Sequence, residues 1–302
     1  MKAIIIGLGT QGYKRKKVLK ERKSYVCSFD PLNIDAEEKN ILNLKKYKFD
    51  TVFLCCPDKY KKKYISIFLK WKKNILVEKP LILSDQYLKK IEKISNLNKK
   101  FFYIAYNHRF EPHFESIKKM IEKGAIGKLY FIKFFYGNGT ARLVNSGWRK
   151  NGLGILEDIG SHLIDICHFW LRKKKLKIEK SHFKSLENIS YDYGNISLNL
   201  SGLIINFEFT YCSWKNTFNC KILGQKGALI MNGLCKWGPS ILENQKRTLP
   251  SGKPNISRFT LKKKDPTWKK EIIYFENCIK KNLRVNLDKE IYLNNLIRKI
   301  KK

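Results

Sequence analysis

Apolar and polar positions alternate regularly over the first 110 residues of the chain. Short runs rich in Ile, Val and Phe are each followed by a longer stretch whose apolar residues recur at helical spacing. Strands are expected at residues 2–6, 25–29, 49–57, 74–77 and 101–106, and helices at 13–23, 59–73 and 84–97. Strands that alternate with helices in this way predict an α/β fold with a doubly wound parallel sheet of the Rossmann type.

The pattern changes after a helix expected near residues 111–123. Further strands are expected at 129–136, 195–200, 203–213, 217–223 and 228–232, and further helices at 156–170, 268–281 and 288–302. A run of strands with a helix against it predicts an α+β domain on a largely antiparallel open sheet. We therefore divide the chain into residues 1–115 and 116–302, with closing helices that can pack back on the first domain.

The first expected strand leads directly into a glycine-rich loop, Gly7-Leu8-Gly9-Thr10-Gln11-Gly12, which opens a helix. In such a loop Gly7 makes the tight turn, Gly9 lets the backbone approach a pyrophosphate, and Gly12 allows close helix packing. The second strand ends at Asp30, where this fold places a carboxylate on the ribose hydroxyls of a dinucleotide. A carboxylate repels a 2′-phosphate, so NAD is favoured over NADP, although Arg15 near the loop weakens this preference.

Charge and cysteine content narrow the class of protein. The net charge of +36 is spread over nearly every helix and loop, which favours a compositionally biased surface over a nucleic-acid site. No apolar run reaches the roughly 18 residues that span a bilayer, and no signal-peptide pattern precedes the first strand. The eight cysteines include no C-x-x-C pair, so reduced thiols in the cytoplasm are expected instead of disulfides or a metal site.

Two groups of polar residues stand out as candidate chemistry. Lys79, between Glu78 and Pro80, follows a strand and could donate a hydrogen bond to a reacting oxygen, and a cis Lys79–Pro80 bond would fix its direction. The alternative is an ordinary strand end at which Pro80 opens the next segment. Asp158, His162 and Asp165 share a helix face. They could supply a general base and its carboxylate, hold a metal, or be satisfied within a packed interface.

The remaining four histidines lack comparable neighbours in the sequence and are interpreted as surface or packing residues: His108, His113, His168 and His182.

Six motifs occur in order along the chain. They are Gly7-x-Gly9-x-x-Gly12, Cys56-Pro57-Asp58, Glu78-Lys79-Pro80, Asn107-His108-Arg109-Phe110, Gly127-Lys128-Leu129 and Gly152-Leu153-Gly154-x-x-x-Asp158-x-Gly160-x-His162-x-x-Asp165. This set resembles the glucose–fructose oxidoreductase / inositol dehydrogenase (Gfo/Idh/MocA) family. The resemblance covers the whole chain, most firmly residues 1–170. One departure is Lys61, which stands where many members carry a histidine.

The resemblance implies an NAD-dependent dehydrogenase acting on a hydroxyl of a sugar, nucleotide sugar or polyol. Its implied catalytic residues are Lys79, which hydrogen-bonds the reacting oxygen, His162, which moves its proton, and Asp158, which tunes the pair. The implied cofactor-binding residues are Gly7, Gly9, Thr10, Gln11, Gly12, Asp30, Cys56, Pro57, Glu78, Lys79 and Asn107. The implied substrate-binding residues are Arg109, Arg142, Trp148, Arg149, Asp158 and His162. No metal and no nucleic-acid or membrane partner is expected.

Two other functions stay open. An NAD-using glycoside hydrolase of the same fold would release a free sugar without net NADH formation. A non-catalytic protein that senses a dinucleotide would not need Lys79, Asp158 and His162 together. An exposed face of the second sheet would make the protein a homodimer or homotetramer.

Overall fold

The computed structural model describes residues 1–140, 154–171 and 176–301, which form two compact units. The first unit combines Met1–Asn107 with Thr267–Asn294, and the second combines His108–Pro266 with Asn295–Lys302. The chain thus divides after Asn107, earlier than the boundary expected at residue 115, and most of the closing helical segment belongs to the first unit.

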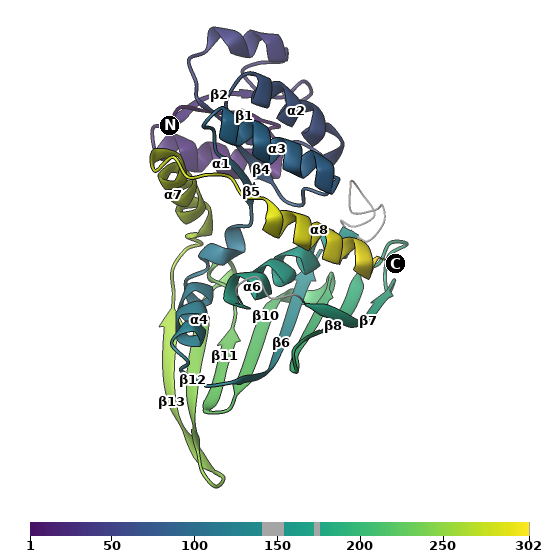
Figure 1. Cartoon of the computed structure of the whole chain (residues 1–302), viewed down its shortest axis with the longest axis vertical. Helices are drawn as coiled ribbons and strands as arrows, with labels where there is room; N and C mark the ends of the chain where they lie inside the picture. Colours follow the sequence, from purple (N-terminus) through teal and green to yellow (C-terminus); the bar gives the residue numbers. More distant parts are fainter. Residues whose placement is uncertain (141–153, 172–175, 302) are drawn as a thin grey trace. The chain divides into compact units, whose positions relative to one another are not determined.

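The first unit is built on a parallel sheet of five strands in the order β2-β1-β3-β4-β5 (Figure 1). The strands are β1 (Ala3–Ile6), β2 (Tyr25–Phe29), β3 (Thr51–Leu54), β4 (Asn74–Glu78) and β5 (Phe102–Ala105). The connections contain α1 (Thr10–Glu21), the 3-10 helix η1 (Ile41–Lys46), α2 (Asp58–Lys70) and α3 (Asp85–Leu97). The predicted doubly wound sheet is confirmed. Its order reverses between β1 and β3, and ligands of such sheets bind at the carboxyl ends of the strands beside this reversal.

Helix α7 (Thr267–Lys280) completes the core of the first unit. Ile5 of β1, Phe53 of β3 and Leu76 of β4 are fully buried in one cluster with Leu19 of α1 and Phe275 of α7. Each such side chain contributes about 1.5–3 kcal/mol when it leaves water. The strand ends that carry the sequence motifs are therefore anchored in a closely packed core.

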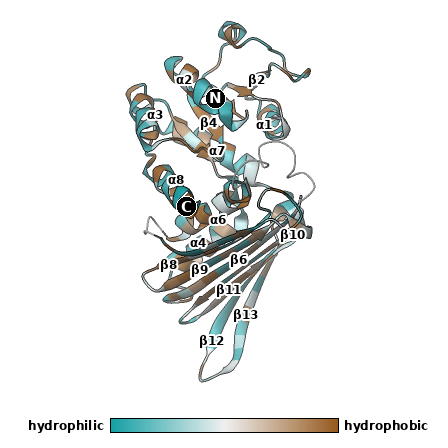
Figure 2. Ribbon diagram, turned by 90° about the vertical axis from the view of Figure 1, so that its right-hand side faces the viewer, coloured by the Kyte–Doolittle hydropathy of each residue, from teal (hydrophilic) through white to brown (hydrophobic). Residues whose placement is uncertain are grey.

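The second unit contains an eight-stranded sheet in the order β13-β12-β11-β10-β6-β9-β8-β7. The strands are β6 (Leu129–Gly139), β7 (Lys177–Lys184), β8 (Tyr193–Leu200), β9 (Leu203–Thr210), β10 (Cys212–Gly224), β11 (Gly227–Asn232), β12 (Ser240–Thr248) and β13 (Gly252–Leu261). All neighbouring pairs are antiparallel except β6 with β9, so the predicted, largely antiparallel sheet is confirmed. Figure 2 shows apolar residues along its central strands.

The second unit also contains helices and short turns. They are the 3-10 helix η2 (Asn107–Phe110), α4 (Pro112–Glu122), the π-helical turn η4 (Leu156–Gly160), α6 (Ser161–Leu171), the 3-10 turn η5 (Cys235–Trp237) and α8 (Asp288–Ile300), which begins in the first unit. Trp170 of α6 is buried, donates its indole N–H to Phe114 O of α4 at 3.0 Å and stacks on Phe134 of β6. These contacts fix α6 on the sheet.

Three strands were not expected from the sequence: β7, β12 and β13. Their residues are mostly polar, and β7 and β13 form the two edges of the sheet with largely exposed side chains. An edge strand needs few apolar residues because only part of it faces the core, and charged residues there discourage pairing with other chains. The hydrophobic pattern is consequently weak in these segments.

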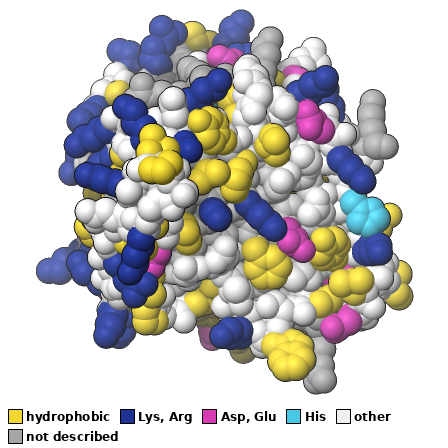
Figure 3. All heavy atoms as spheres, turned by 90° about the horizontal axis from the view of Figure 1, so that it is seen from below, with side chains coloured by type: hydrophobic (Ala, Val, Ile, Leu, Met, Phe, Trp, Pro, Cys, Tyr) yellow, Lys and Arg dark blue, Asp and Glu magenta, His cyan; other side chains and the backbone are white. Residues whose placement is uncertain are grey.

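On the face seen in Figure 3, the Lys and Arg side chains are not gathered into one separate patch. Lys and Arg side chains are scattered there among hydrophobic groups and are denser toward the left edge. That this charge reflects compositional bias stays a prediction. Within the described residues, no helix has the length and apolar character required to cross a membrane.

Candidate active site

The glycine-rich loop between β1 and α1 has the geometry that its sequence predicts. Gly7 has φ +90°, and a Cβ there would lie 2.7 Å from Cys56 Cα, at the end of β3. A Cβ on Gly12 would lie 2.2 Å from Gly7 O, so both glycines are required by close backbone packing. A Cβ on Gly9 would meet no described protein atom within 4 Å. The space beside Gly9 therefore fits an external group.

Gly9 is also the N-cap residue of α1. It provides no side-chain cap, and the first turn of α1 contains no acidic residue. A helix N-terminus of this kind presents backbone N–H groups, here from the turn that contains Thr10 and Gln11, and the positive end of the helix dipole to an anion. Open space and a positive helix end together fit the pyrophosphate of a dinucleotide.

Asp30 follows β2 and supports the same loop. Its carboxylate accepts hydrogen bonds from Leu8 N at 2.8 Å, Leu32 N at 2.9 Å and Asn33 N at 3.1 Å. Partial burial alone would raise the pKa of Asp30, but these backbone N–H groups outweigh it and lower the pKa. Asp30 is thus a stable negative charge next to the glycine loop, as a group that selects against a 2′-phosphate should be.

Lys79 follows β4, and its peptide bond to Pro80 is cis. The residues on both sides of Lys79 are held by Lys61 of α2, which is 2% exposed. Lys61 Nζ donates hydrogen bonds to Glu78 O and, at 2.7 Å, to Pro80 O, and it forms an ion pair with Asp58 Oδ1 at 2.6 Å. The lysine that departs from the family pattern therefore binds the backbone that carries Lys79.

Arg15 does not face a phosphate site. Its guanidinium is 1% exposed and bonded to two carboxylates, with Nε 2.7 Å from Glu78 Oε1 and Nη2 2.6 Å from Glu271 Oε2 of α7, while Trp268 covers its face at 4.5 Å. Two buried ion pairs occupy this side chain, so its position does not support the expectation that Arg15 weakens the NAD preference. Sequence reasoning missed Glu271, since nothing local links it to a residue 256 positions away.

Burial raises the pKa of Glu271 to about 7. The Arg15 charge lowers this pKa, whereas the neighbouring Glu78 carboxylate raises it. Two carboxylates that share one buried guanidinium cannot both be fully compensated, so Glu271 is the group that holds a proton most easily.

The three polar residues of the segment 156–171 have different partners. Asp158 lies in the π-helical turn and accepts a hydrogen bond from Tyr211 Oη at 2.9 Å. Asp165 in α6 is buried and forms a bidentate ion pair with Arg109, whose Nε lies 2.6 Å from Asp165 Oδ2. Among the described residues, no group of three or more His, Cys, Asp and Glu side chains is placed to hold a metal ion.

His162 of α6 is buried beside a second histidine, His108 of η2. Their ring centroids are 3.7 Å apart, and their planes meet at 36°. His108 is therefore a packing residue, as one of the two expected interpretations has it, but the expectation that it lacks comparable neighbours is wrong. The Asn-His-Arg-Phe motif was noted in the sequence, but only the tertiary structure shows that its histidine reaches α6.

The other predicted site residues are placed as follows. Asn107 donates a hydrogen bond from Nδ2 to Thr267 Oγ1 at 2.9 Å. Cys56 is buried, which raises the pKa of its thiol to about 11, and all eight cysteines are free thiols. Arg142, Trp148 and Arg149 lie outside the described residues.

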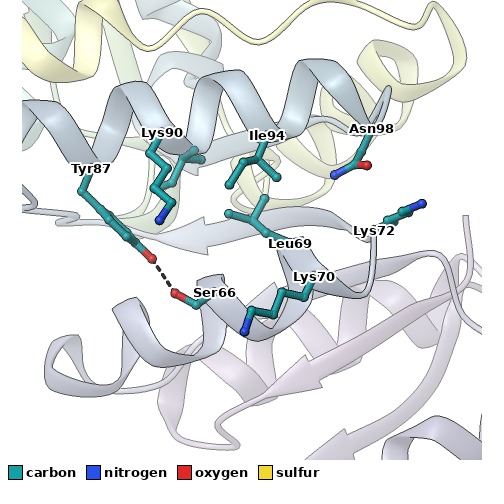
Figure 4. Close-up of a pocket in the computed structure, with 9 residues that line it drawn as sticks. Ser66, Leu69, Lys70, Lys72, Tyr87, Lys90, Ile94 and Asn98 are labelled. Carbon is teal, nitrogen blue, oxygen red and sulfur yellow. Dashed lines mark hydrogen bonds between the residues drawn. The ribbon is translucent and has the colours of Figure 1, made fainter.

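A cavity of about 230 Å³ lies elsewhere in the first unit, between α2 and α3 (Figure 4). Leu69 and Ile94 lie on its apolar floor, and Ser66 Oγ and Tyr87 Oη are 2.7 Å apart at one end. No residue of the six motifs lines it. We therefore do not assign it to the candidate site.

The doubly wound sheet and its glycine cradle fit a dinucleotide, and a second, α+β unit accompanies them. Residues 114–230 match the model of the GFO/IDH/MocA C-terminal domain. This match, to part of the second unit, bears out the family resemblance seen in the motifs.

Similar proteins agree with this family resemblance. The chain is 27% identical to an inositol 2-dehydrogenase of Rhizobium meliloti over 129 residues, 43% of this chain and 38% of that protein. It is 25% identical to the scyllo-inositol 2-dehydrogenase (NAD(+)) of Bacillus subtilis over 260 residues, 78% and 74% of the two chains. A solved structure from Desulfitobacterium hafniense, named as a candidate NADPH-dependent oxidoreductase, has a TM-score of 0.84 at 16% identity, covering 100% of this chain and 94% of that one. The first match thus covers well under two thirds of the Rhizobium meliloti protein. The solved structure, at 16% identity, supports the fold alone.

Proposed function

We propose that this protein is an NAD-dependent oxidoreductase that moves a hydride between nicotinamide and a hydroxyl-bearing carbon of a sugar, nucleotide sugar or polyol. The observation that carries the proposal is the cradle at Gly9, where a missing Cβ leaves open space at the N-terminus of α1. The inositol dehydrogenases among its relatives support the substrate class. The unpaired thiols support a reducing, cytoplasmic setting.

The cofactor-binding residues belong to the ends of all five strands of the first sheet. The loop Gly7–Gly12 binds the pyrophosphate, Asp30 binds the ribose hydroxyls, and the ends of β3 and β4 bind the nicotinamide half through Cys56, Pro57, Glu78 and Lys79, with Asn107 beyond β5. NAD is the preferred cofactor because Asp30 is charged and Arg15 is engaged elsewhere. The relatives' names include both NAD and NADPH, so this preference belongs to the proposal.

The chemistry needs a base and a cationic hydrogen-bond donor at one substrate oxygen. When bound, the nicotinamide accepts the hydride from the carbon. Lys79 donates a hydrogen bond to the reacting oxygen, and His162 accepts its proton as the general base. Asp158 binds the substrate and favours the protonated state of His162 after transfer. Arg109, predicted to bind substrate, is assigned instead to holding α6 through its ion pair with Asp165.

Absorbance of NADH tests the proposal directly. The purified protein is assayed with NAD or NADP and with nucleotide sugars, free sugars and inositols. We expect a signal with one substrate class, lowered about 10²–10⁴-fold in Lys79→Met and unchanged in Lys63→Met, an exposed lysine of α2. Tight NAD binding with no signal for any substrate contradicts the dehydrogenase. Release of free sugar from glycosides would then identify the hydrolase, and its absence the sensor.

A homo-oligomer is part of the proposal. Ile204 of β9, Phe131 of β6 and Leu223 of β10 lie in register on three neighbouring strands, and all three side chains are partly or largely exposed. An apolar row on an open sheet supports pairing with a second copy. We expect a dimer or tetramer by light scattering, and a lower mass for Phe131→Lys. A monomeric parent protein at micromolar concentration contradicts this expectation.

A further inference from the structure

Four side chains from four different elements of the second unit form a series of contacts that ends at His162. His108 comes from η2, His162 from α6, Tyr136 from β6 and Lys236 from η5. Lys236 Nζ lies 2.8 Å from Tyr136 Oη and 3.4 Å from His108 Nε2, and Tyr136 Oη lies 3.5 Å from the same nitrogen. This cluster behind the proposed base has no role in the proposed reaction so far.

The contact with Lys236 decides the protonation state of His108. An ammonium group can only donate hydrogen bonds, so His108 Nε2 must act as the acceptor and carry no proton. A positive charge at 3.4 Å also disfavours a second positive charge on the imidazole. Lys236 is itself held over the ring of Trp237 at 4.4 Å. His108 is therefore a neutral ring with its proton on Nδ1.

A neutral His108 in turn affects His162. Two imidazoles with centroids 3.7 Å apart cannot both be protonated at low cost, because like charges at this distance repel strongly in a buried site. The stacked ring also restricts the orientation of the His162 plane. Lys236 and Tyr136 thus act on His162 through His108.

We propose that His108 and Lys236 are positioning residues for His162: Lys236 keeps His108 neutral, and the neutral ring orients His162 and allows it to take up a proton. The inference rests on the role proposed for His162 as the general base. Other charged groups in the described part of this unit are Asp158, which accepts a hydrogen bond from Tyr211, Asp165 with its partner Arg109, and Asp265, whose charge acts on Tyr136.

These groups act in different ways. Asp158, four residues before His162, favours the protonated form of His162, whereas Lys236 disfavours a charge on His108. Burial raises the pKa of Tyr136, and the charges of Asp158 and Asp265 raise it further, so this hydroxyl remains neutral and contributes no charge of its own. Asp165 is compensated by Arg109. Lys236 is the charge that contacts His108 directly, and a single substitution removes it.

Histidine NMR titration of the full chain without substrate tests the inference. The chain contains five histidines, so the His108 and His162 signals are assigned with His108→Gln and His162→Gln variants. We expect Lys236→Met to raise the apparent pKa of His108 by about 0.5–1 unit, because the positive charge beside it is lost and His108 then competes with His162 for a proton. Lys236→Arg keeps the charge and should leave the titration unchanged. Lys236→Gln serves as a second neutral variant with a polar end.

The result that overturns the inference is a His108 titration that is the same in the parent, Lys236→Met and Lys236→Gln proteins. Where dehydrogenase activity is present, the low-pH limb of kcat/KM should move in the neutral variants, whereas a purely structural role would lower kcat without moving the limb. Where no substrate is found, the NMR result still decides the inference. The NMR titration thereby separates a failure of this inference from a failure of the proposed function.

Discussion

Lys61 Nζ lies 2.7 Å from the main-chain oxygen of Pro80, and the same nitrogen bonds to Glu78 O. The ammonium thus bridges the two residues that flank Lys79. Because Lys61 is buried, its removal would leave the carbonyl groups of Glu78 and Pro80 without this partner. Each loss lowers the free energy of unfolding by up to about 3 kcal/mol.

We expect Lys61→Met to lower the free energy of unfolding by about 2 kcal/mol and to lower kcat more than it changes the Kd of NAD. The reason is that the backbone carrying Lys79 loses its support. Denaturant unfolding and isothermal titration provide the two measurements. Lys63→Met, on the exposed side of α2, is the matched control, and equal effects of both variants would contradict this role for Lys61.

The glycine loop allows stability and cofactor binding to be separated. Gly9→Ala adds a Cβ that meets no described protein atom, so we expect a loss of stability below about 1 kcal/mol but at least tenfold weaker NAD binding. Gly12→Ala forces a Cβ against Gly7 O and should destabilise the unit by more than about 2 kcal/mol. Thermal unfolding with and without NAD measures both. Unchanged NAD affinity in Gly9→Ala would show that the pyrophosphate lies elsewhere.

Glu271 makes the stability of the first unit pH-dependent. Its folded pKa of about 7 exceeds the usual value for a glutamic acid, so between these values the folded state holds a proton that the unfolded state has lost. The contribution of Glu271 to the free energy of unfolding is therefore full at low pH, and it declines by about 3 kcal/mol as the pH rises toward 7. Urea unfolding from pH 4.5 to 8 should show this decline in the parent and in Glu21→Gln, an exposed control. A decline of the same size in Glu271→Gln would assign it to another group.

Asp30 should set the choice between NAD and NADP. Asp30→Asn removes the charge while keeping an oxygen that can accept from Leu8 N, so we expect the preference for NAD to fall about tenfold with a small loss of stability. Fluorescence titration of both reduced cofactors gives the two Kd values. Asp35→Asn, an exposed acid in the same loop, is the comparison. A preference that survives in Asp30→Asn would mean that another group rejects the 2′-phosphate.

The sequence by itself determined the first sheet, its glycine loop and the polar strand ends, because these depend on local patterns. The run Ala3–Ile6 is buried at every position and turns at Gly7, which nearby residues alone encode. The segments β7 and β13 escaped prediction because exposed edge strands carry little apolar pattern, and β12, next to the β13 edge, escaped it because its sequence is mostly polar.

Only the tertiary structure decided the partners of the buried charges. Arg15, adjacent to the loop in sequence, pairs with Glu78 and Glu271, and His108 stacks on His162. A buried charge is stable only beside a partner, and that partner can come from any part of the chain that the fold brings near. Local spacing identifies a residue that can do chemistry, whereas long-range packing decides whether it faces a ligand or another side chain.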